Sequence, residues 1–261
     1  MKISITVPSI YPDACERALN NLRDATRGDY EVILISPFEP PGGARKNVVW
    51  LREDPATASG CNAGHALALK YFTGDFVVPW VDDHLIADGW DTTLVRYYEE
   101  RENRFHKKHA GKPFSVGLRH AWPHHVGTEF GIYYPYFPFQ RRSYLDAVGW
   151  FDPAYKKGFA DSDLALRIWS AGGRCEWSDK AYIVVHHDDN RKDGVVFDPR
   201  DMELFVERWA PVYGQGWQTG HIRDFNMDVV PEDFTGLVSD NTFHQNCPSF
   251  RDRVLAGGWR Q

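Results

Sequence analysis

Short apolar runs recur along the first half of the chain and alternate with segments whose apolar residues are spaced as on one face of a helix. Each run is followed by Pro, Ser or charged residues, a pattern typical of buried strands with loops at their ends. The predicted strands are residues 3–7, 31–35, 47–51 and 75–81. The predicted helices are residues 13–26, 59–72 and 91–105, the last two with Ser59 and Asp91 as N-caps. Strands and helices in this order predict an α/β fold with a parallel, doubly wound sheet.

The second half of the chain has a less regular pattern. Residues 112–142 are rich in Pro, Gly, His and aromatic residues, which predicts loops and short strands over a cleft. Beyond them the pattern predicts helices at 143–148, 161–171 and 202–209 and a strand at 181–185. No repeat or linker divides the chain. We therefore expect one domain over residues 1–210, with halves of about 1–110 and 111–210, and a C-terminal extension, residues 211–261, packed on it.

Composition and charge exclude several classes of protein. The chain has 261 residues, of which 43% are apolar and 25% charged, ordinary values for a globular protein. Its 36 acidic and 30 basic residues give a net charge of −6, which argues against a protein that binds nucleic acid by its phosphates. Four widely spaced cysteines fit a reducing compartment. With no signal peptide and no apolar stretch of roughly 20 residues, we expect a cytoplasmic protein without a membrane span.

Polar residues follow three of the predicted strands. Pro8, Ser36 and the pair Asp82–Asp83 each come directly after a strand end. Ligands of parallel sheets bind outside the carboxyl ends of the strands, so these residues are expected to line one edge. Two adjacent carboxylates repel each other, and a divalent cation such as Mg²⁺ or Mn²⁺ removes that repulsion. The alternative is a polar turn without a metal ion.

Asp161 and Asp163 lie at the start of a predicted helix. Asp is a favoured N-cap and suits the positive end of the helix dipole, so a structural role is one interpretation. The other is that an ionised carboxylate at this place accepts a proton from a bound hydroxyl.

Histidines offer two further possibilities. His186 follows a predicted strand and is a potential metal ligand on the same edge as Asp83. His120, His124 and His125 suggest a rival zinc site, although they lack the ordered His/Glu spacing of zinc motifs.

In order and spacing, these segments resemble the family 2 glycosyltransferases. Each motif is weak alone, but together they occur in the family's order over residues 3–210. The matching segments are Ile5-Thr6-Val7-Pro8-Ser9, Gly60-Cys61-Asn62-Ala63-Gly64, Gly74-Asp75 with the strand to Val81-Asp82-Asp83, Val148-Gly149-Trp150-Phe151-Asp152, Phe159 to Arg167, and Ile183-Val184-Val185-His186.

The resemblance implies a GT-A fold, in which a Rossmann-like, mostly parallel central sheet is flanked by helices. Its first half would bind a nucleotide-sugar, and its aromatic-rich second half would face the acceptor. It implies a metal-dependent transfer of the sugar to an acceptor hydroxyl, with inversion and with Asp161 as the general base. Asp83 and His186 would hold Mn²⁺ or Mg²⁺. The donor would be bound by Pro8, Ser9, Tyr11, Ser36, Asn62 and Asp82.

Three departures from the family pattern concern the substrates. Ser36 stands where the family commonly has an Asp that contacts uracil, Cys61 replaces an Arg, and Ala160 replaces a Glu before the base. A UDP-sugar is therefore favoured without being assured, and the acceptor, whether a glycan, a lipid-linked sugar, a protein or a small molecule, is open. Ala160 also leaves open a binding module on the same fold that holds nucleotide or carbohydrate without turnover. A zinc hydrolase that uses the histidines is a third alternative.

Overall fold

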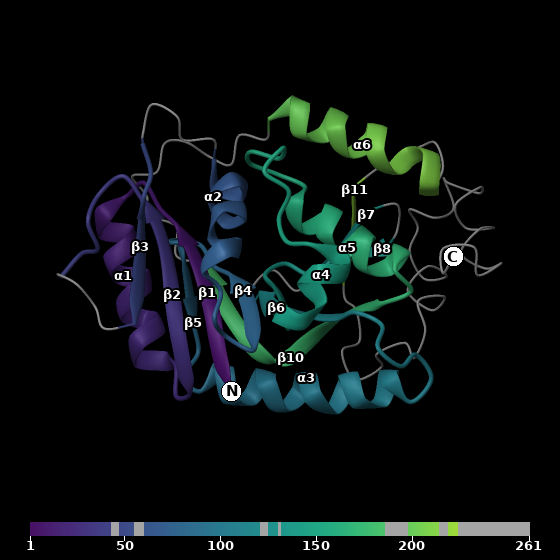
Figure 1. Ribbon diagram of the computed structural model, residues 1–261, viewed down its shortest axis with the longest axis horizontal. Helices are drawn as coiled ribbons and strands as arrows, with labels where there is room; N and C mark the ends of the chain where they lie inside the picture. The colour runs from purple at the N-terminus through teal and green to yellow at the C-terminus, as the bar shows by residue number, and fades with distance from the viewer. Residues whose placement is uncertain are drawn as a thin grey trace.

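The computed structural model describes residues 1–42, 47–54, 60–120, 125–129, 132–185, 198–213 and 219–223. Their centre is a mixed sheet of eight strands in the order β3-β2-β1-β4-β9-β6-β10-β5. Helices flank this sheet, and a second sheet of three short strands lies towards the other end of the molecule (Figure 1). The expected α/β architecture is confirmed.

The first half of the chain forms the parallel part of the sheet. Strands β1 (Lys2–Pro8), β2 (Asp29–Ser36), β3 (Val48–Arg52) and β4 (Phe76–Pro79) pair in parallel. The central strands β1, β2 and β4 carry continuous buried runs, as expected of strands covered on both faces. The connecting helices are α1 (Pro12–Ala25) and α2 (Cys61–Leu67), which continues as the 3₁₀ turn η1 (Ala68–Tyr71).

The second half adds antiparallel strands to the same sheet. Strand β9 (Pro138–Arg141) lies between β4 and β6 (Phe114–His120) and is antiparallel to both. Strand β10 (Arg174–Val185) runs parallel to β6, and the short strand β5 (His84–Ile86) pairs with it antiparallel. Within the described residues, four of the seven pairings are parallel and three antiparallel, so the predicted mostly parallel sheet is confirmed, with antiparallel pairings at β9 and β5. The chain returns from β6 into β9, and that return reverses the strand direction.

The remaining elements agree in type with the predicted ones, apart from one strand after residue 215, where the sequence predicted only turns. They are the helices α3 (Trp90–His106), η2 (Arg142–Tyr144), α4 (Leu145–Val148), α5 (Ala160–Ser170) and α6 (Pro199–Tyr213), and the small sheet of β7 (His125–Glu129), β8 (Ile132–Tyr133) and β11 (Thr219–Arg223). Strand β11 comes from the expected C-terminal extension and pairs with β7. No helix in the described part of the chain is both long and apolar enough to cross a bilayer.

Helix ends differ from the expected caps. The N-cap of α3 is Gly89, in the left-handed region at φ 68°, and not Asp91. The Asp91 carboxylate instead accepts hydrogen bonds from the backbone N–H groups of Arg27 and Gly28, at 2.6–3.2 Å. It therefore ties α3 to the segment that follows α1. Ser59 lies outside the described residues, and Gly60 occupies the N-cap position of α2.

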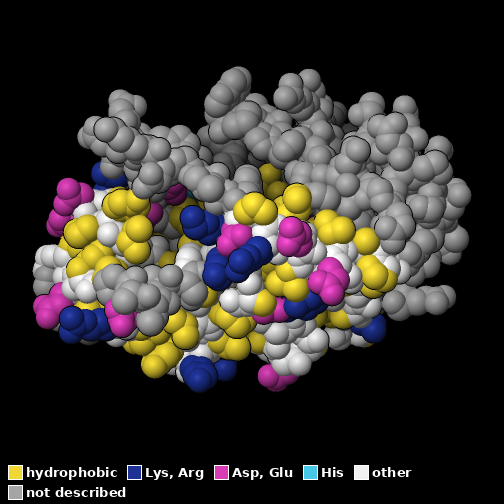
Figure 2. Space-filling view, turned by 90° about the horizontal axis from the view of Figure 1, so that it is seen from above, with side chains coloured by type: hydrophobic (Ala, Val, Ile, Leu, Met, Phe, Trp, Pro, Cys, Tyr) yellow, Lys and Arg dark blue, Asp and Glu magenta, His cyan; other side chains and the backbone are white. Residues whose placement is uncertain are grey.

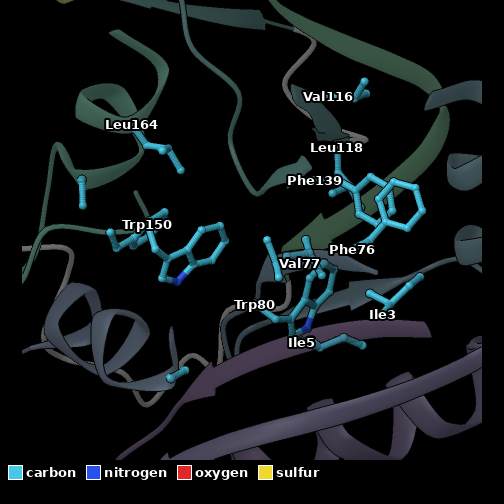
Figure 3. Packing of buried hydrophobic residues seen from close by; sticks show 14 of the residues in the cluster. Ile3, Ile5, Phe76, Val77, Trp80, Val116, Leu118, Phe139, Trp150 and Leu164 are labelled. Carbon is cyan, nitrogen blue, oxygen red and sulfur yellow. The ribbon is translucent and has the colours of Figure 1, made fainter. Parts of the chain in front are cut away.

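The core joins both halves of the chain. Phe76 of β4 stacks on Phe139 of β9 with ring centroids 4.7 Å apart, and Tyr98 of α3 meets both rings edge-on. Figure 3 shows Phe76 and Phe139 together with Trp80, directly after β4, and with Trp150 and Leu164 from the second half. Because the antiparallel strand β9 supplies core residues between β4 and β6, the two halves form one continuous core.

Candidate active site

The carboxyl ends of β1 and β4 lie side by side and place two predicted residues in contact. The register pairs Thr6 with Pro79, so the segments after both strands leave the sheet together. The Ser9 hydroxyl donates a hydrogen bond to Asp82 Oδ2 at 2.5 Å, and both residues are buried. Tyr11 is 40% exposed, and its backbone N–H lies 3.3 Å from the same Ser9 oxygen. The prediction that the segments after these strands share one edge, made for Pro8 and Asp82, is therefore confirmed for β1 and β4.

Asp83 lies next to a histidine that the sequence did not single out as a partner. Asp83 Oδ1 is 2.6 Å from Nδ1 of His84, the first residue of β5. The His84 ring packs against Phe137, with centroids 5.0 Å apart, and against Trp80. This packing fixes the ring and thereby one side of the Asp83 carboxylate.

The Ser36 side chain forms hydrogen bonds to other residues of the first half of the chain. It is fully buried at the end of β2, its hydroxyl donates to the Phe38 carbonyl at 2.6 Å, and it receives the Trp50 indole N–H at 3.1 Å.

Helix α2 links this edge to the second half of the chain. A Cβ atom on Gly64 would lie 2.9 Å from Pro8 Cβ, so α2 packs closely on the end of β1. The Asn62 side-chain amide donates to the Gly158 carbonyl at 3.1 Å, and its backbone N–H donates to the Lys156 carbonyl at 3.2 Å. The segment held by these bonds leads directly into α5 and Asp161.

Asp161 lies in the first turn of α5 but does not cap the helix. The N-cap is Phe159, a non-glycine residue in the left-handed region at φ 63°. Asp161 Oδ1 accepts the N–H of Ser162 at 2.9 Å, and no cation among the described residues pairs with the carboxylate. Its side chain is only partly accessible, and desolvation raises its pKa from 3.8 to about 6.

The negative charge of the Asp161 carboxylate acts on two tyrosines and a cysteine from other parts of the chain. The Tyr134 hydroxyl donates to that of Tyr136 at 3.3 Å, and their rings meet edge-on at 5.1 Å. Burial raises the pKa of Tyr134 well above its ordinary value and that of Tyr136 to about 12, and the negative charge of Asp161 adds to both shifts. Desolvation also raises the pKa of Cys61, with contributions from the charges of Asp161 and Asp201. Sequence analysis identified none of these neighbours, because residues far apart in the chain carry no local signal of contact.

Asp163, by contrast, belongs to a structural network. It is fully buried and bound by Arg167 at 2.8 Å and Arg208 at 2.8 Å, with further hydrogen bonds from Trp209 and Tyr155. These partners satisfy the carboxylate and join α5 to α6. Asp161 and Asp163, both in the first turn of α5, therefore have different environments.

The expected metal ligands are described only in part. His186 and His124 lie outside the described residues, and His120 and His125 fall in β6 and β7. Over the described ranges, no three His, Cys, Asp or Glu residues are grouped so as to hold a metal ion. Viewed from above, the described surface mixes acidic, basic and hydrophobic side chains (Figure 2).

Comparison with known proteins identifies the fold. No family model matches the sequence, and no curated protein matches it. Among solved structures, the chain is similar to "GalNAc-T7 with UDP, GalNAc and Mn2+", with a TM-score of 0.59 and 12% identity over 80% of this chain. The match covers 48% of that protein, so the chain spans about half its length. It is also similar to S. aureus TarS 1-349, with a TM-score of 0.53 and 13% identity, covering 98% of this chain and 72% of that one.

A structure of S. aureus TarS 1-349 in complex with UDP matches with a TM-score of 0.51 at 15% identity, again over 98% of this chain and 72% of that one. At such low identities the similarity establishes the architecture, and the narrower resemblance to family 2 stays a prediction. The mixed sheet shares its fold with these structures, which supports the predicted GT-A fold.

Proposed function

We propose that the protein is a glycosyltransferase that moves a sugar from a nucleotide-sugar donor onto a hydroxyl group of an acceptor. The observation that carries this proposal is the connection between two carboxylates. Asp82 lies at the carboxyl edge of the sheet, where α/β proteins bind ligands, and α2 joins that edge to the segment that leads into Asp161. The GT-A fold, shared with proteins whose structures contain UDP and Mn²⁺, supports the same activity.

The donor would bind along the ends of β1, β2 and β4. We assign this role to Pro8, Ser9, Tyr11, Ser36, Asn62 and Asp82, with a UDP-sugar as the favoured donor. The Ser36 hydroxyl and the Asn62 amide are engaged by protein carbonyls, so their proposed contribution is to shape the pocket. Tyr11 is exposed, and its aromatic ring could stack on the nucleotide base.

The residues after β4 suit a divalent cation. Carboxylate oxygens are the ligands that Mg²⁺ and Mn²⁺ prefer, and Asp83 presents them next to a rigidly packed His84. We propose that Asp83 holds the cation together with His186. Bound there, the cation would neutralise charge on the diphosphate leaving group.

Asp161 would act as the general base. Its carboxylate would take the proton of the acceptor hydroxyl while the acceptor oxygen forms a bond to the anomeric carbon. The bond from that carbon to the diphosphate oxygen breaks, and the nucleoside diphosphate leaves. Attack from the face opposite the leaving group inverts the anomeric configuration. A pKa of about 6 suits this role, because the carboxylate is ionised at neutral pH and is still a stronger base than an ordinary Asp.

The test is a survey of nucleotide-sugars with Mn²⁺ and hydroxyl acceptors, monitored by release of nucleoside diphosphate. We expect release that depends on the acceptor, is lost on chelation and falls about 10²–10⁴-fold in Asp161→Asn. Asp83→Asn should also lose activity. The matched control is Asp88→Asn, because Asp88 is exposed and pairs with Arg27 on the surface. Tight donor binding without any release would support a binding module instead, and retained configuration by NMR would refute the inverting mechanism.

A further inference from the structure

The backbone of residues 156–158, shortly before Asp161, is hydrogen-bonded to the carboxylate of Asp201 from another helix. Asp201, in the first turn of α6, is 2% exposed. Its side chain accepts three consecutive backbone N–H groups, from Lys156 at 2.9 Å, Lys157 at 2.7 Å and Gly158 at 2.9 Å. Hydrogen bonds to an ionised acceptor are stronger than neutral ones, and three successive N–H groups form a concave anion site.

The same segment is held from its other side by the start of α2. Asn62 donates to the carbonyl groups of Lys156 and Gly158, as described above. A Cβ atom on Gly60 would lie 2.2 Å from the Lys156 carbonyl oxygen, so only glycine allows this approach. Residues 156–158 therefore have their three N–H groups bound by Asp201 of α6, and the carbonyl groups of Lys156 and Gly158 are bound by Asn62 of α2.

The hydrogen bonds to residues 156–158 also restrict the backbone of the next residue, Phe159. A non-glycine residue at φ 63° persists where its surroundings enforce the conformation. The Phe159 ring also stacks on Phe205 of α6, with centroids 5.0 Å apart. Asp161 follows two residues later. Its place in the site thus depends on the backbone that Asp201 and Phe205 hold.

A purely local role for Asp201 does not account for these contacts. An acidic residue in the first turn of a helix interacts favourably with the helix dipole and can bond the N–H groups of its own helix. The hydrogen bonds of the Asp201 side chain within the described residues all go to the segment before α5.

We propose that Asp201 is a positioning residue that fixes the backbone of residues 156–158 and so sets the place of the Asp161 carboxylate. This inference rests on the proposed function, in which Asp161 is the general base. Helix α6 follows the last segment that resembles the family. The proposal gives this helix an indirect role in catalysis, because its Asp201 holds residues 156–158.

The test measures the Asp161 carboxyl directly, by NMR titration of its side-chain carbon in the full chain. In the wild type this carboxyl, whose charge acts on Cys61, Tyr134 and Tyr136, should titrate near pH 6. In Asp201→Asn an amide NH₂ replaces one accepting oxygen, so the segment loosens and water reaches Asp161. Its midpoint should then fall towards about 3.9, the ordinary value of Asp. The control is Asp198→Asn. Within the described residues its carboxylate accepts the N–H of Arg200 and contacts no part of the segment 156–158, so this variant should titrate like the wild type.

Transfer kinetics supply the second readout. Asp201→Asn should lower kcat by about 10- to 100-fold because the base is misplaced. The KM for the donor should change less, since the loosened segment contacts the proposed donor pocket through Asn62. Where Asp201→Asn does not fold, Asp201→Glu decides, since it keeps the charge but moves the carboxylate away from the three N–H groups. An unchanged titration midpoint and unchanged kcat in a folded variant would overturn the proposal. If the wild type shows no transfer, the proposed function fails, while the titration still judges whether Asp201 places Asp161.

Discussion

Replacing Asp161 by Asn should make the protein more stable at alkaline pH while it abolishes transfer. The Asp161 pKa of about 6 lies above the ordinary value of 3.8 because the folded protein desolvates the carboxylate. Ionisation therefore costs more in the folded state than in the unfolded chain. Asn has nearly the shape of the protonated acid and can still accept the Ser162 N–H, but it carries no charge.

The magnitude follows from the two pKa values. Below about pH 4 the carboxyl is protonated in both states, and the substitution should change the free energy of unfolding little. Between about pH 4 and 6 only the unfolded chain releases the proton readily, so the wild type loses stability as pH rises. Above pH 6 the penalty is complete, and at about 1.4 kcal/mol per pH unit it amounts to at most about 3 kcal/mol. Partial solvent access of the side chain reduces this figure.

The assay is urea denaturation of the wild type and Asp161→Asn at pH 8 and at the lowest pH at which both stay folded. We expect the variant to be more stable at pH 8, and the gain to shrink as pH falls through 6. At about 2–4 °C per kcal/mol, melting temperatures should differ by several degrees at pH 8. Asp88→Asn should show no such gain, because Arg27 lowers the pKa of Asp88. Equal stability differences at both pH values would refute the desolvation argument.

Cys61 provides an independent probe of the same charge. Desolvation, with added repulsion from Asp161 and Asp201, raises the pKa of its thiol to about 11, so little thiolate exists at pH 8. Asp161→Asn removes one of the two charges. Alkylation of Cys61 by iodoacetamide should therefore be faster in this variant than in the wild type, as followed by mass spectrometry. An unchanged rate would place the Asp161 charge too far from Cys61 to act on it.

Two further predictions concern the strand edge and its link to α5. Gly60→Ala should destabilise the protein by at least about 2 kcal/mol in urea denaturation and lower transfer, since the new Cβ meets the Lys156 carbonyl and φ is 97°. The control is Gly111→Ala, which has φ 71° but open space around it and should cost only about 1 kcal/mol. Ser9→Ala removes the hydrogen bond to the buried Asp82 carboxylate and should cost about 1–3 kcal/mol and weaken UDP binding with Mn²⁺ by calorimetry; an unchanged denaturation midpoint would contradict it.

Much of the first half of the fold was predictable from local pattern. Strands β1, β2 and β3 end within two residues of their predicted bounds, because apolar runs closed by Pro or polar residues suit buried strands. The shared edge of Pro8 and Asp82 followed from one rule, that the carboxyl ends of parallel strands lie together, whereas the hydrogen bond from Ser9 to Asp82 was not predicted. Element type was also correct for α5 and α6, whose apolar residues recur at helical spacing.

Elements of the sheet that pair across long distances were missed. The sequence suggests short strands between residues 112 and 142, but nothing in it shows that β9 inserts between β4 and β6 and reverses the direction of the sheet. Asp91 has the residue type and position of a helix cap, and yet it bonds a segment more than sixty residues away. Hydrogen bonds between distant segments depend on which elements pack together, and periodicity contains no information about that.

By itself, then, the sequence determined the order of strands and helices, the acidic residues that follow β4 and the acid pair that opens α5. Those features depend on neighbours a few residues away, which side-chain periodicity and capping preferences encode directly. Only the tertiary structure distinguished Asp161, desolvated beside two tyrosines, from Asp163, satisfied by two arginines. It alone brought Asp201 to a segment 43–45 residues earlier in the chain. Burial and hydrogen-bond partners decide what a carboxylate can do, and both are properties of the packed chain.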